Sequence, residues 1–209
     1  MNRIKKINFA GLLLIIAYVI PMQAQELYKN EDAPLHERIM DLLSRLTVEE
    51  KVSLLRATSP GISRLDIPKY YHGNEALHGV VRPGRFTVFP QAIGLAATWN
   101  PELQYQVATV ISDEARARWN ELDQGKLQKG QFSDLLTFWS PTVNMARDPR
   151  WGRVSEGNGE DPFLGAAIAR AMIRGYQGKD MSRNDEIMAC VKHFALYGAS
   201  EAGRDYNTV

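Results

Sequence analysis

Charged side chains are crowded into one loop-like stretch of the sequence, ARDPRWGRVSEGNGEDP (residues 146–162). Arginines and carboxylates alternate along it, and its prolines and glycines exclude a regular helix or strand. Bidentate arginine–carboxylate pairs can make such a loop rigid, which is the structural interpretation of most of these charges. The functional interpretation is that an arginine points into a pocket and donates hydrogen bonds to a ligand rich in hydroxyl groups.

A second candidate is the dipeptide Lys192-His193, which follows the short apolar run IMACV (residues 187–191). A fixed cation beside an imidazole suits vicinal hydroxyl groups, or a phosphate. The alternative is a solvated lysine next to a histidine that is satisfied by its neighbours. The dipeptide alone does not decide between these interpretations.

The third cluster is YYHGNEALHGV (residues 70–80), which combines two aromatic rings, two histidines, an amide and a carboxylate. His72, Glu75 and His78 could suggest a metal site, but their spacing is not that of the zinc helix motif. We therefore expect no metal here. A sugar suits these residues better, because aromatic rings stack on its apolar faces and Glu75 can accept hydrogen bonds from its hydroxyl groups.

Four helices are predicted around these clusters. Residues 34–46 have apolar residues at helical spacing, and Thr47 with Glu50 forms a capping-box pattern for a short second helix. Asn100-Pro101 and Asp161-Pro162 are typical starts of two longer helices. The stripes predicted to be buried are Leu103, Val107, Val110, Ile111 and Ala115 in the third helix, and Phe163, Leu164, Ala167, Ile168, Ala171, Met172 and Tyr176 in the fourth.

Short apolar runs predict the strands. GVV (79–81), FTVFP (86–90) and AIGLAATW (92–99) are predicted to be short strands and connections, and residues 120–134 a polar loop. LLTFWSPTVNM (135–145) is nearly all apolar, as in a strand covered on both faces. The order of strand, loop, helix and strand indicates a parallel α/β protein. In parallel barrels the carboxyl ends of the strands meet on one face, where both the arginine-rich loop and Lys192-His193 would then lie.

Composition excludes several classes of protein. The 209 residues are 44% hydrophobic and 23% charged, which is typical of a globular protein. The formal net charge of +1 provides no basic excess for phosphate neutralisation, so we expect no nucleic-acid partner. Cys190 is the only cysteine, which excludes an internal disulfide, and its apolar neighbours predict a buried, inert thiol.

The first 24 residues have the order of a secretory signal peptide. Arg3, Lys5 and Lys6 precede an apolar run at residues 9–20, and the small residue Ala24 follows. The run is shorter than the ~20 residues of a spanning helix, although a retained membrane anchor is the alternative. We expect cleavage, no stable membrane anchor, and export to the periplasm or the medium, with residues 25–209 forming part of one domain.

Together the three clusters resemble glycoside hydrolase family 3, the exo-acting β-glucosidases and β-xylosidases. The resemblance runs from about residue 35 to the end, and its motifs occur in the family's order. They are NEALHG (74–79), TVFPQAIGLAATWNPEL (87–103), SPTVNMARDPRWGR (140–153), EGNGEDP (156–162) and VKHFALYGASEAGRDYNTV (191–209).

The resemblance implies the fold and the site. The fold is a (β/α)8 TIM-type barrel, of which this chain carries about the N-terminal half, and its top face binds one terminal sugar. No cofactor and no metal is implied. The positions that match the family's sugar-binding residues are Glu75, Arg153, Lys192 and His193. The residues expected to support them are Arg147, Asp148, Arg150, Glu156 and Glu160.

The resemblance also implies hydrolysis with retention through a covalent glycosyl-enzyme, which needs two carboxyl groups ~5 Å apart. The family's nucleophile is an aspartate in a Ser-Asp motif on a later strand, and its acid/base residue comes from a later domain. Ser112-Asp113 and Ser133-Asp134 lack that context. We therefore assign no catalytic carboxylate and expect an N-terminal fragment, inactive alone, whose partners are the rest of the barrel and the C-terminal domains.

The substrate is less sharply indicated. NEALHG is similar to the xylosidase and plant-type branch, whereas KHFALYGASEAGRDYNTV is similar to periplasmic bacterial β-glucosidases. The interpretation favours a β-glucosidase acting on β-linked oligosaccharides or glycosides, with a β-xylosidase as the alternative. A non-catalytic sugar-binding protein is the rival from another class. A third interpretation is a phosphate-binding barrel that uses the arginine-rich loop. It is the weakest of the three, because the sequence offers no glycine-rich phosphate cradle to support it.

Overall fold

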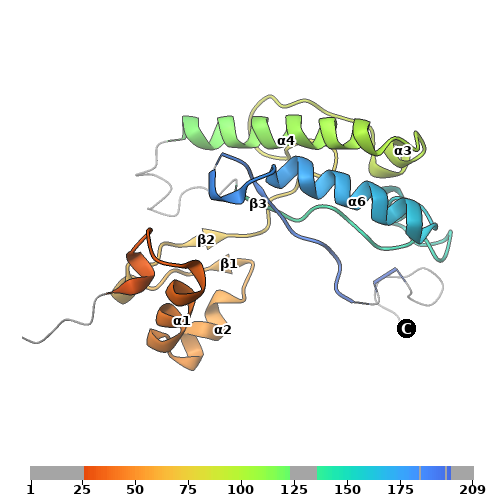
Figure 1. The fold of residues 1–209 in the computed structure, drawn as a ribbon. Helices are drawn as coiled ribbons and strands as arrows, with labels where there is room; N and C mark the ends of the chain where they lie inside the picture. The colour runs from red at the N-terminus through yellow and green to blue at the C-terminus, as the bar shows by residue number, and fades with distance from the viewer. Residues whose placement is uncertain (1–25, 123–135, 184, 196, 199–209) are drawn as a thin grey trace, which may run out of the picture. The chain divides into compact units, whose positions relative to one another are not determined.

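The computed structural model describes residues 26–122, 136–183, 185–195 and 197–198 (Figure 1). The chain divides into two compact units, Met1–Lys51 and Val52–Val209. The predicted signal peptide lies outside the described residues, as does most of the polar loop predicted at 120–134. Within the described residues, no helix has the length and apolar character that a membrane span requires.

The first unit is helical. It contains the 3-10 helix η3 (Leu27–Lys29), α1 (Leu35–Arg45) and the start of α2 (Val48–Leu54). The predicted capping box is present: the Thr47 backbone N–H donates to Glu50 Oε2 at 2.8 Å, and the Glu50 N–H donates to Thr47 Oγ1 at 3.2 Å. Both helices predicted for this region are thereby confirmed.

The second unit contains the candidate site residues. Its elements are β1 (Thr58–Ser59), η4 (Ser63–Leu65), β2 (Tyr70–Tyr71), α3 (Ala92–Ala96), α4 (Pro101–Glu121), β3 (Thr137–Phe138), η5 (Val154–Glu156), α6 (Pro162–Gln177), η6 (Met181–Arg183) and β4 (Met188–Ala189). β1 and β2 form an antiparallel pair, whereas β3 and β4 are parallel.

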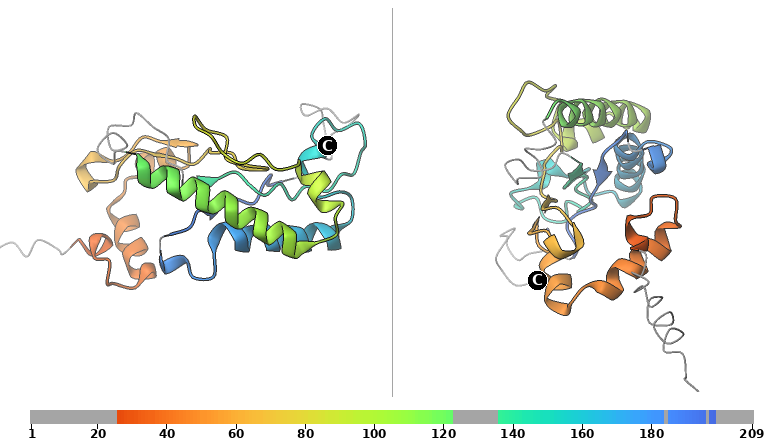
Figure 2. Two further views of the ribbon diagram at one scale, coloured as in Figure 1. Left: turned by 90° about the horizontal axis from the view of Figure 1, so that it is seen from above. Right: turned by 90° about the vertical axis from the view of Figure 1, so that its left-hand side faces the viewer.

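The two long helices α4 and α6 lie side by side (Figures 1 and 2). Both begin where the sequence predicts, because Asn100 Oδ1 accepts from the N–H of Leu103 at 3.0 Å and Asp161 Oδ1 accepts from that of Phe163 at 2.8 Å. Gly175 allows the close approach of the helices, since a Cβ there would lie 2.5 Å from Ala108 Cβ.

The buried stripes of these helices differ from the prediction. In α4 the buried residues are Gln104, Val107, Ala108, Ile111, Ser112 and Ala115, and in α6 they are Ile168, Ala169, Met172, Gly175 and Tyr176. The predicted core residues Leu103, Val110 and Phe163 are exposed. The prediction for α4 counted only apolar residues as buried. Ser112 is buried as well, because its hydroxyl is satisfied by donating to the Tyr176 carbonyl at 2.9 Å.

Three chain segments run parallel to one another, and the sequence predicts two of them, at 135–145 and 187–191, as strands. An isolated bridge pairs Asn74 with Phe138, the register of β3 and β4 pairs Thr137 with Met188, and a further bridge pairs Thr142 with Lys192. The segment at residues 136–143 is therefore central. The candidate residues that were predicted to follow the strands lie at or after the carboxyl ends of these parallel segments.

Residues 79–99 were predicted to be short strands and connections, and the structure has connections and one helix there. Residues 92–96 form the helix α3, residues 86–90 have no regular structure, and residues 79–81 contribute only a bridge between Leu77 and Gly79. A short apolar run fits a buried helix and a buried strand equally well, so periodicity cannot separate them. The strand predicted at 135–145 is present only as the short β3, although backbone hydrogen bonds continue beyond it: the Cys190 N–H donates to the Ser140 carbonyl at 3.0 Å and the Lys192 N–H to the Pro141 carbonyl at 3.3 Å.

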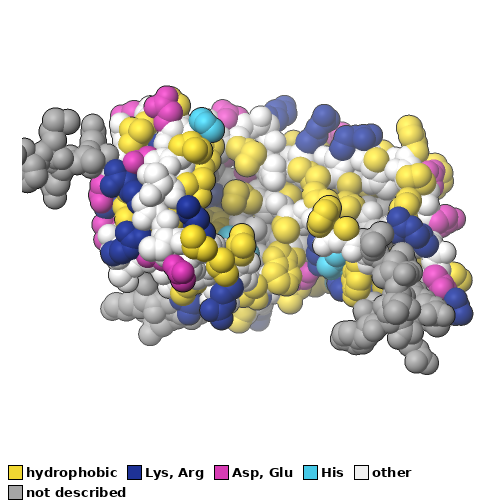
Figure 3. Space-filling model, turned by 90° about the horizontal axis from the view of Figure 1, so that it is seen from below, with side chains coloured by type: hydrophobic (Ala, Val, Ile, Leu, Met, Phe, Trp, Pro, Cys, Tyr) yellow, Lys and Arg dark blue, Asp and Glu magenta, His cyan; other side chains and the backbone are white. Residues whose placement is uncertain are grey.

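The core lies between the two helices and the parallel segments, and Tyr176 joins its parts. The Tyr176 hydroxyl donates to the Ala76 carbonyl at 2.6 Å and lies 3.2 Å from Ser140 Oγ, and burial raises its pKa. Hydrophobic side chains also reach the surface (Figure 3), with Phe194 and Val191 among them. Cys190 is half-buried rather than buried, because it lies on the short strand segment next to these exposed residues.

Candidate functional site

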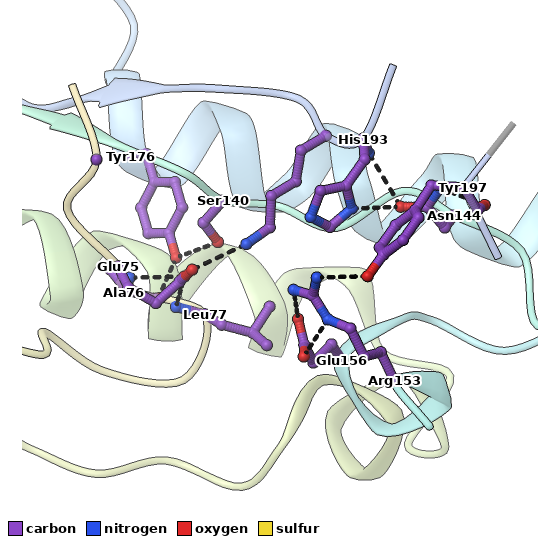
Figure 4. A network of polar contacts seen from close by, with 12 residues as sticks. Glu75, Ala76, Leu77, Ser140, Asn144, Arg153, Glu156, Tyr176, His193 and Tyr197 are labelled. Atoms are coloured by element: carbon purple, nitrogen blue, oxygen red, sulfur yellow. Dashed lines mark hydrogen bonds and ion pairs between the residues drawn. The ribbon is translucent and has the colours of Figure 1, made fainter. Parts of the chain in front are cut away.

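Glu75 and Lys192 form an ion pair across the central segment at residues 136–143, with which both of their own segments pair (Figure 4). Lys192 Nζ donates to Glu75 Oε2 at 2.8 Å, and the lysine side chain is only 10% exposed. The other carboxylate oxygen of Glu75 accepts from the backbone N–H groups of Ala76 and Leu77 at 2.9 and 3.0 Å. The carboxylate is therefore fixed in place, and the buried ammonium has the partner that it needs.

Arg153 begins the turn of η5 and is held by two side chains. Its Nε and Nη2 donate to the two carboxylate oxygens of Glu156 at 2.7 and 2.6 Å, and its Nη1 donates to the Tyr197 hydroxyl at 3.0 Å. The hydrogen bonds to Glu156 raise the pKa of Arg153. In return, Arg153 holds the pKa of Glu156 below its ordinary value of 4.5, to which Lys192 and His193 also contribute.

His193 is placed by Asn144. The His193 backbone N–H donates to Asn144 Oδ1 at 2.9 Å, and the ring Nδ1 lies 2.9 Å from the same oxygen. The imidazole also meets the Tyr197 ring in an edge-to-face contact with centroids 4.6 Å apart. Tyr197 thus contacts both His193 and Arg153.

The remaining charges of the arginine-rich loop are arranged differently. Arg150 Nη2 donates to Asp148 Oδ2 at 2.7 Å, and these bonds lower the pKa of Asp148 to about 2. No hydrogen bond between described residues joins this pair to Arg153, and Arg147 and Glu160 form no ion pair there either. Glu156 contacts Arg153 directly, whereas support by Arg147, Asp148, Arg150 and Glu160 stays a prediction.

The four predicted sugar-binding residues therefore lie in two groups, which the adjacent residues Lys192 and His193 join. Glu75 pairs with Lys192, while Arg153 and His193 meet at Tyr197 (Figure 4). A cavity of 690 Å³ borders Lys192 and His193 on the side of α6. Asn144 and Tyr197 line that cavity as well, whereas Glu75 and Arg153 do not.

Residue-by-residue reasoning on the sequence missed Asn144 and Tyr197. Both lie inside recognised motifs, but neither is charged, and their partners are 49 and 44 residues away along the chain. Trp151 is another buried member of the loop, at 2% exposure, and its ring meets that of Tyr197 edge to face. The only available signal was that aromatic and amide residues occur close to the charged ones.

The aromatic cluster at residues 70–80 has contacts within itself and with two other segments. The rings of Tyr70 and His72 lie 4.6 Å apart, and the Tyr70 hydroxyl shares a hydrogen bond with Thr137 Oγ1. His78 Nδ1 lies 2.9 Å from the carbonyl of Phe89. Within the described part of the chain, no group of three or more His, Cys, Asp or Glu side chains could hold a metal ion.

Comparison with known sequences gives a consistent picture. Residues 40–209 match the family model of the glycosyl hydrolase family 3 N-terminal domain. The chain is 39% identical to a xylan 1,4-β-xylosidase of Xylanibacter ruminicola over 92% of its length, and 32% identical to a periplasmic β-glucosidase of Salmonella typhimurium over 90%. It spans 22% and 27% of those two relatives, respectively.

Solved structures agree with these sequences. An exo-β-xylosidase in complex with a xylobiose aziridine probe is similar over 85% of this chain, with a TM-score of 0.65 and 30% identity. A β-glucosidase from Listeria innocua in complex with glucose is similar over 83%, with a TM-score of 0.62 and 30% identity. This chain covers 23% and 28% of those two chains. The predicted fold class, part of a (β/α)8 TIM-type barrel, is confirmed.

Proposed function

This chain belongs to glycosyl hydrolase family 3, and we propose that it supplies the sugar-binding half of the site of an exo-acting, retaining β-glycosidase. Glu75, Arg153, Lys192 and His193 bind the terminal non-reducing sugar of a β-linked substrate. The observation that carries the proposal is that Glu75, Arg153 and the Lys192-His193 pair, which are far apart in sequence, are held in two polar groups: Glu75 with Lys192, and Arg153 with His193 through Tyr197.

The hydrogen-bonding capacity of the two cations supports this role. Arg153 has five N–H donors, of which three are used by Glu156 and Tyr197 among the described residues. Lys192 has three, of which one is used by Glu75. The remaining donors can reach hydroxyl oxygens without breaking the ion pairs that fix both side chains. Such pre-organisation reduces the entropy cost of binding.

The same geometry argues against a catalytic role for these carboxylates. A general acid needs a carboxyl group with a raised pKa, whereas Arg153 lowers that of Glu156. Glu75 is committed to a lysine and two backbone N–H groups. Asp113 lies on α4 beside the buried Ser112 and is exposed, and Ser133-Asp134 lies outside the described residues. We therefore assign the chain a binding role.

The choice between glucose and xylose is part of the proposal. The preference for a β-glucosidase rests on the sequence motifs alone, whereas the similar proteins support a β-glucosidase and a β-xylosidase equally, because they carry both names. The two sugars differ by one hydroxymethyl group. A single group of that size in a pocket contributes ~1–3 kcal/mol of discrimination.

Export is proposed as well. Residues 1–24 have the signal-peptide pattern, and one of the similar proteins is named a periplasmic β-glucosidase. We propose that the mature chain acts in the periplasm or the medium. Mass spectrometry of the protein from the source cell would show a start near Gln25, and a retained Met1 would contradict this.

Calorimetric titration of the chain with glucose, xylose and the acyclic alcohol sorbitol tests the proposal. We expect saturable binding of glucose or xylose, weak or no binding of sorbitol, and loss of the heat in Arg153→Ala but not in Arg150→Ala. Equal binding by both variants would remove the site assignment. Binding without hydrolysis of an aryl β-glucoside or β-xyloside by this chain is expected, whereas hydrolysis would contradict the binding-only role.

A further inference from the structure

Asn144 lies between two segments of the site and contacts both with its side-chain amide. Its Nδ2 donates to the Tyr197 carbonyl at 2.8 Å, and its Oδ1 accepts from the His193 backbone N–H at 2.9 Å. A backbone carbonyl can only accept, and a backbone N–H can only donate. These two partners therefore fix which end of the amide is oxygen, an assignment that is otherwise ambiguous.

The orientation of this amide determines the state of the neighbouring imidazole. His193 Nδ1 lies 2.9 Å from the same Asn144 Oδ1. Because that oxygen only accepts, Nδ1 must carry a proton to make a hydrogen bond. In a neutral imidazole with Nδ1 protonated, Nε2 is the acceptor.

We infer that Asn144 is a positioning residue that holds His193 in its Nδ1–H tautomer, so that Nε2 accepts a hydrogen bond from a ligand hydroxyl. The identity of the ligand as a sugar rests on the proposed function, whereas the tautomer does not. Lys192 and Arg153 can only donate. With His193 Nε2 as an acceptor beside these donors, neighbouring hydroxyl groups of the ligand take different roles. One accepts a hydrogen bond from a cation, and the next donates one to His193.

Asn144 also has a second consequence. By donating to the Tyr197 carbonyl it fixes the residue whose hydroxyl accepts from Arg153. The amide thus joins the segment at 136–144 to the residues that place both His193 and Arg153. Tyr197→Phe separates the two effects, because it removes the hydroxyl that meets Arg153 and leaves the bonds of Asn144 to the backbone and to His193.

Nitrogen-15 NMR of histidine-labelled chain tests the tautomer without any sugar. The chain has four histidines, and the His193 signals are assigned by their loss in His193→Gln. At about pH 8, above the ordinary histidine pKa of ~6.5, two-bond correlations should show the Nδ1–H pattern for His193. Asn144→Asp and Tyr197→Phe should keep it. Asn144→Leu should shift the ring toward the Nε2–H form that solvated histidine prefers.

Several results would overturn the inference. They are an Nε2–H pattern in the parent chain, an unchanged Nδ1–H pattern in Asn144→Leu, or an Nε2–H pattern in Asn144→Asp. The parent and the aspartate variant keep the test decisive if the leucine variant does not fold. In calorimetry, Asn144→Leu should weaken glucose or xylose binding about three- to tenfold. A parent chain that binds neither sugar would contradict the proposed function and leave the tautomer test intact.

Discussion

The loop of residues 146–162 contains two arginine–carboxylate pairs with nearly the same internal geometry. Arg153 Nη2 lies 2.6 Å from Glu156 Oε2, and Arg150 Nη2 lies 2.7 Å from Asp148 Oδ2. Their surroundings differ. The Arg150 side chain is 68% exposed, whereas that of Arg153 is 31% exposed and also donates to Tyr197.

The difference shows that residue type and an ion pair do not by themselves identify an arginine that can bind a ligand. An exposed ion pair competes with water and contributes little to stability. Arg153 is instead connected through Tyr197 to the strand end that carries His193. Among the described residues, two N–H groups of Arg153 take no part in these pairs and are carried by a guanidinium that is fixed on two sides, whereas the Arg150 side chain is mostly exposed.

Removing Arg153 should weaken ligand binding strongly, whereas removing Arg150 should not change it. We expect Arg153→Ala to weaken glucose or xylose binding by about 100-fold or more, because two charge-assisted hydrogen bonds of ~1.5–3 kcal/mol each are lost. Arg150→Ala should leave the dissociation constant unchanged within error. Calorimetric titration of both variants checks this, and a similar loss in both would erase the distinction between the pairs.

The lysine of the ion pair Glu75–Lys192 is more buried than either arginine, so this pair tests how burial changes the contribution of an ion pair to stability. We expect Lys192→Met to lower the free energy of unfolding by about 1–2 kcal/mol. This is below the 3–5 kcal/mol of a fully buried pair, because Glu75 remains 36% exposed and solvent can compensate its charge. Urea denaturation measures the change. Arg150→Met is the matched control, and an equal loss there would contradict the role of burial.

Neutralising Glu156 should have a smaller effect on ligand binding than removing Arg153. In Glu156→Gln the guanidinium stays but loses its charged partner, so its position becomes less defined. We expect affinity to fall about tenfold, the equivalent of one charge-assisted bond. Asp148→Asn is the control on the exposed pair and should have no effect. Unchanged affinity in Glu156→Gln would show that Tyr197 alone places Arg153.

Acid titration should separate the two pairs by pH. Both carboxylates have folded pKa values below their ordinary ones, of 4.5 for Glu156 and 3.8 for Asp148. The unfolded chain therefore binds more protons, so each contribution is present above the ordinary pKa and is lost as pH falls through the folded pKa. For Asp148 that loss continues to about pH 2.

Unfolding measured from about pH 6 to pH 3 should show a decline that is smaller in Glu156→Gln than in the parent. Asp148→Asn should change the profile least, because its pair is more exposed to solvent. An identical pH profile for the parent and Glu156→Gln would show that the half-buried pair contributes nothing to stability.

Local sequence predicted the parts of the fold that depend on near neighbours. The capping box at Thr47 and Glu50, and the starts of α4 and α6, follow from hydrogen bonds that span two or three residues. The short apolar runs at 86–90 and 92–96 were predicted only as short strands and connections, and the second of them forms a helix. Their pattern is compatible with several structures, and the packing of the rest of the chain decides between them.

The sequence by itself determined which charges are available, where the main helices begin, and the parallel order of strand and helix. Only the tertiary structure decided which of these charges meet. Lys192 reaches Glu75 across 117 residues, and Arg153 reaches Tyr197 across 44. The physical reason is range: a helix cap is formed by adjacent residues in any context, whereas these pairs exist only because parallel segments bring distant strand ends together on one face.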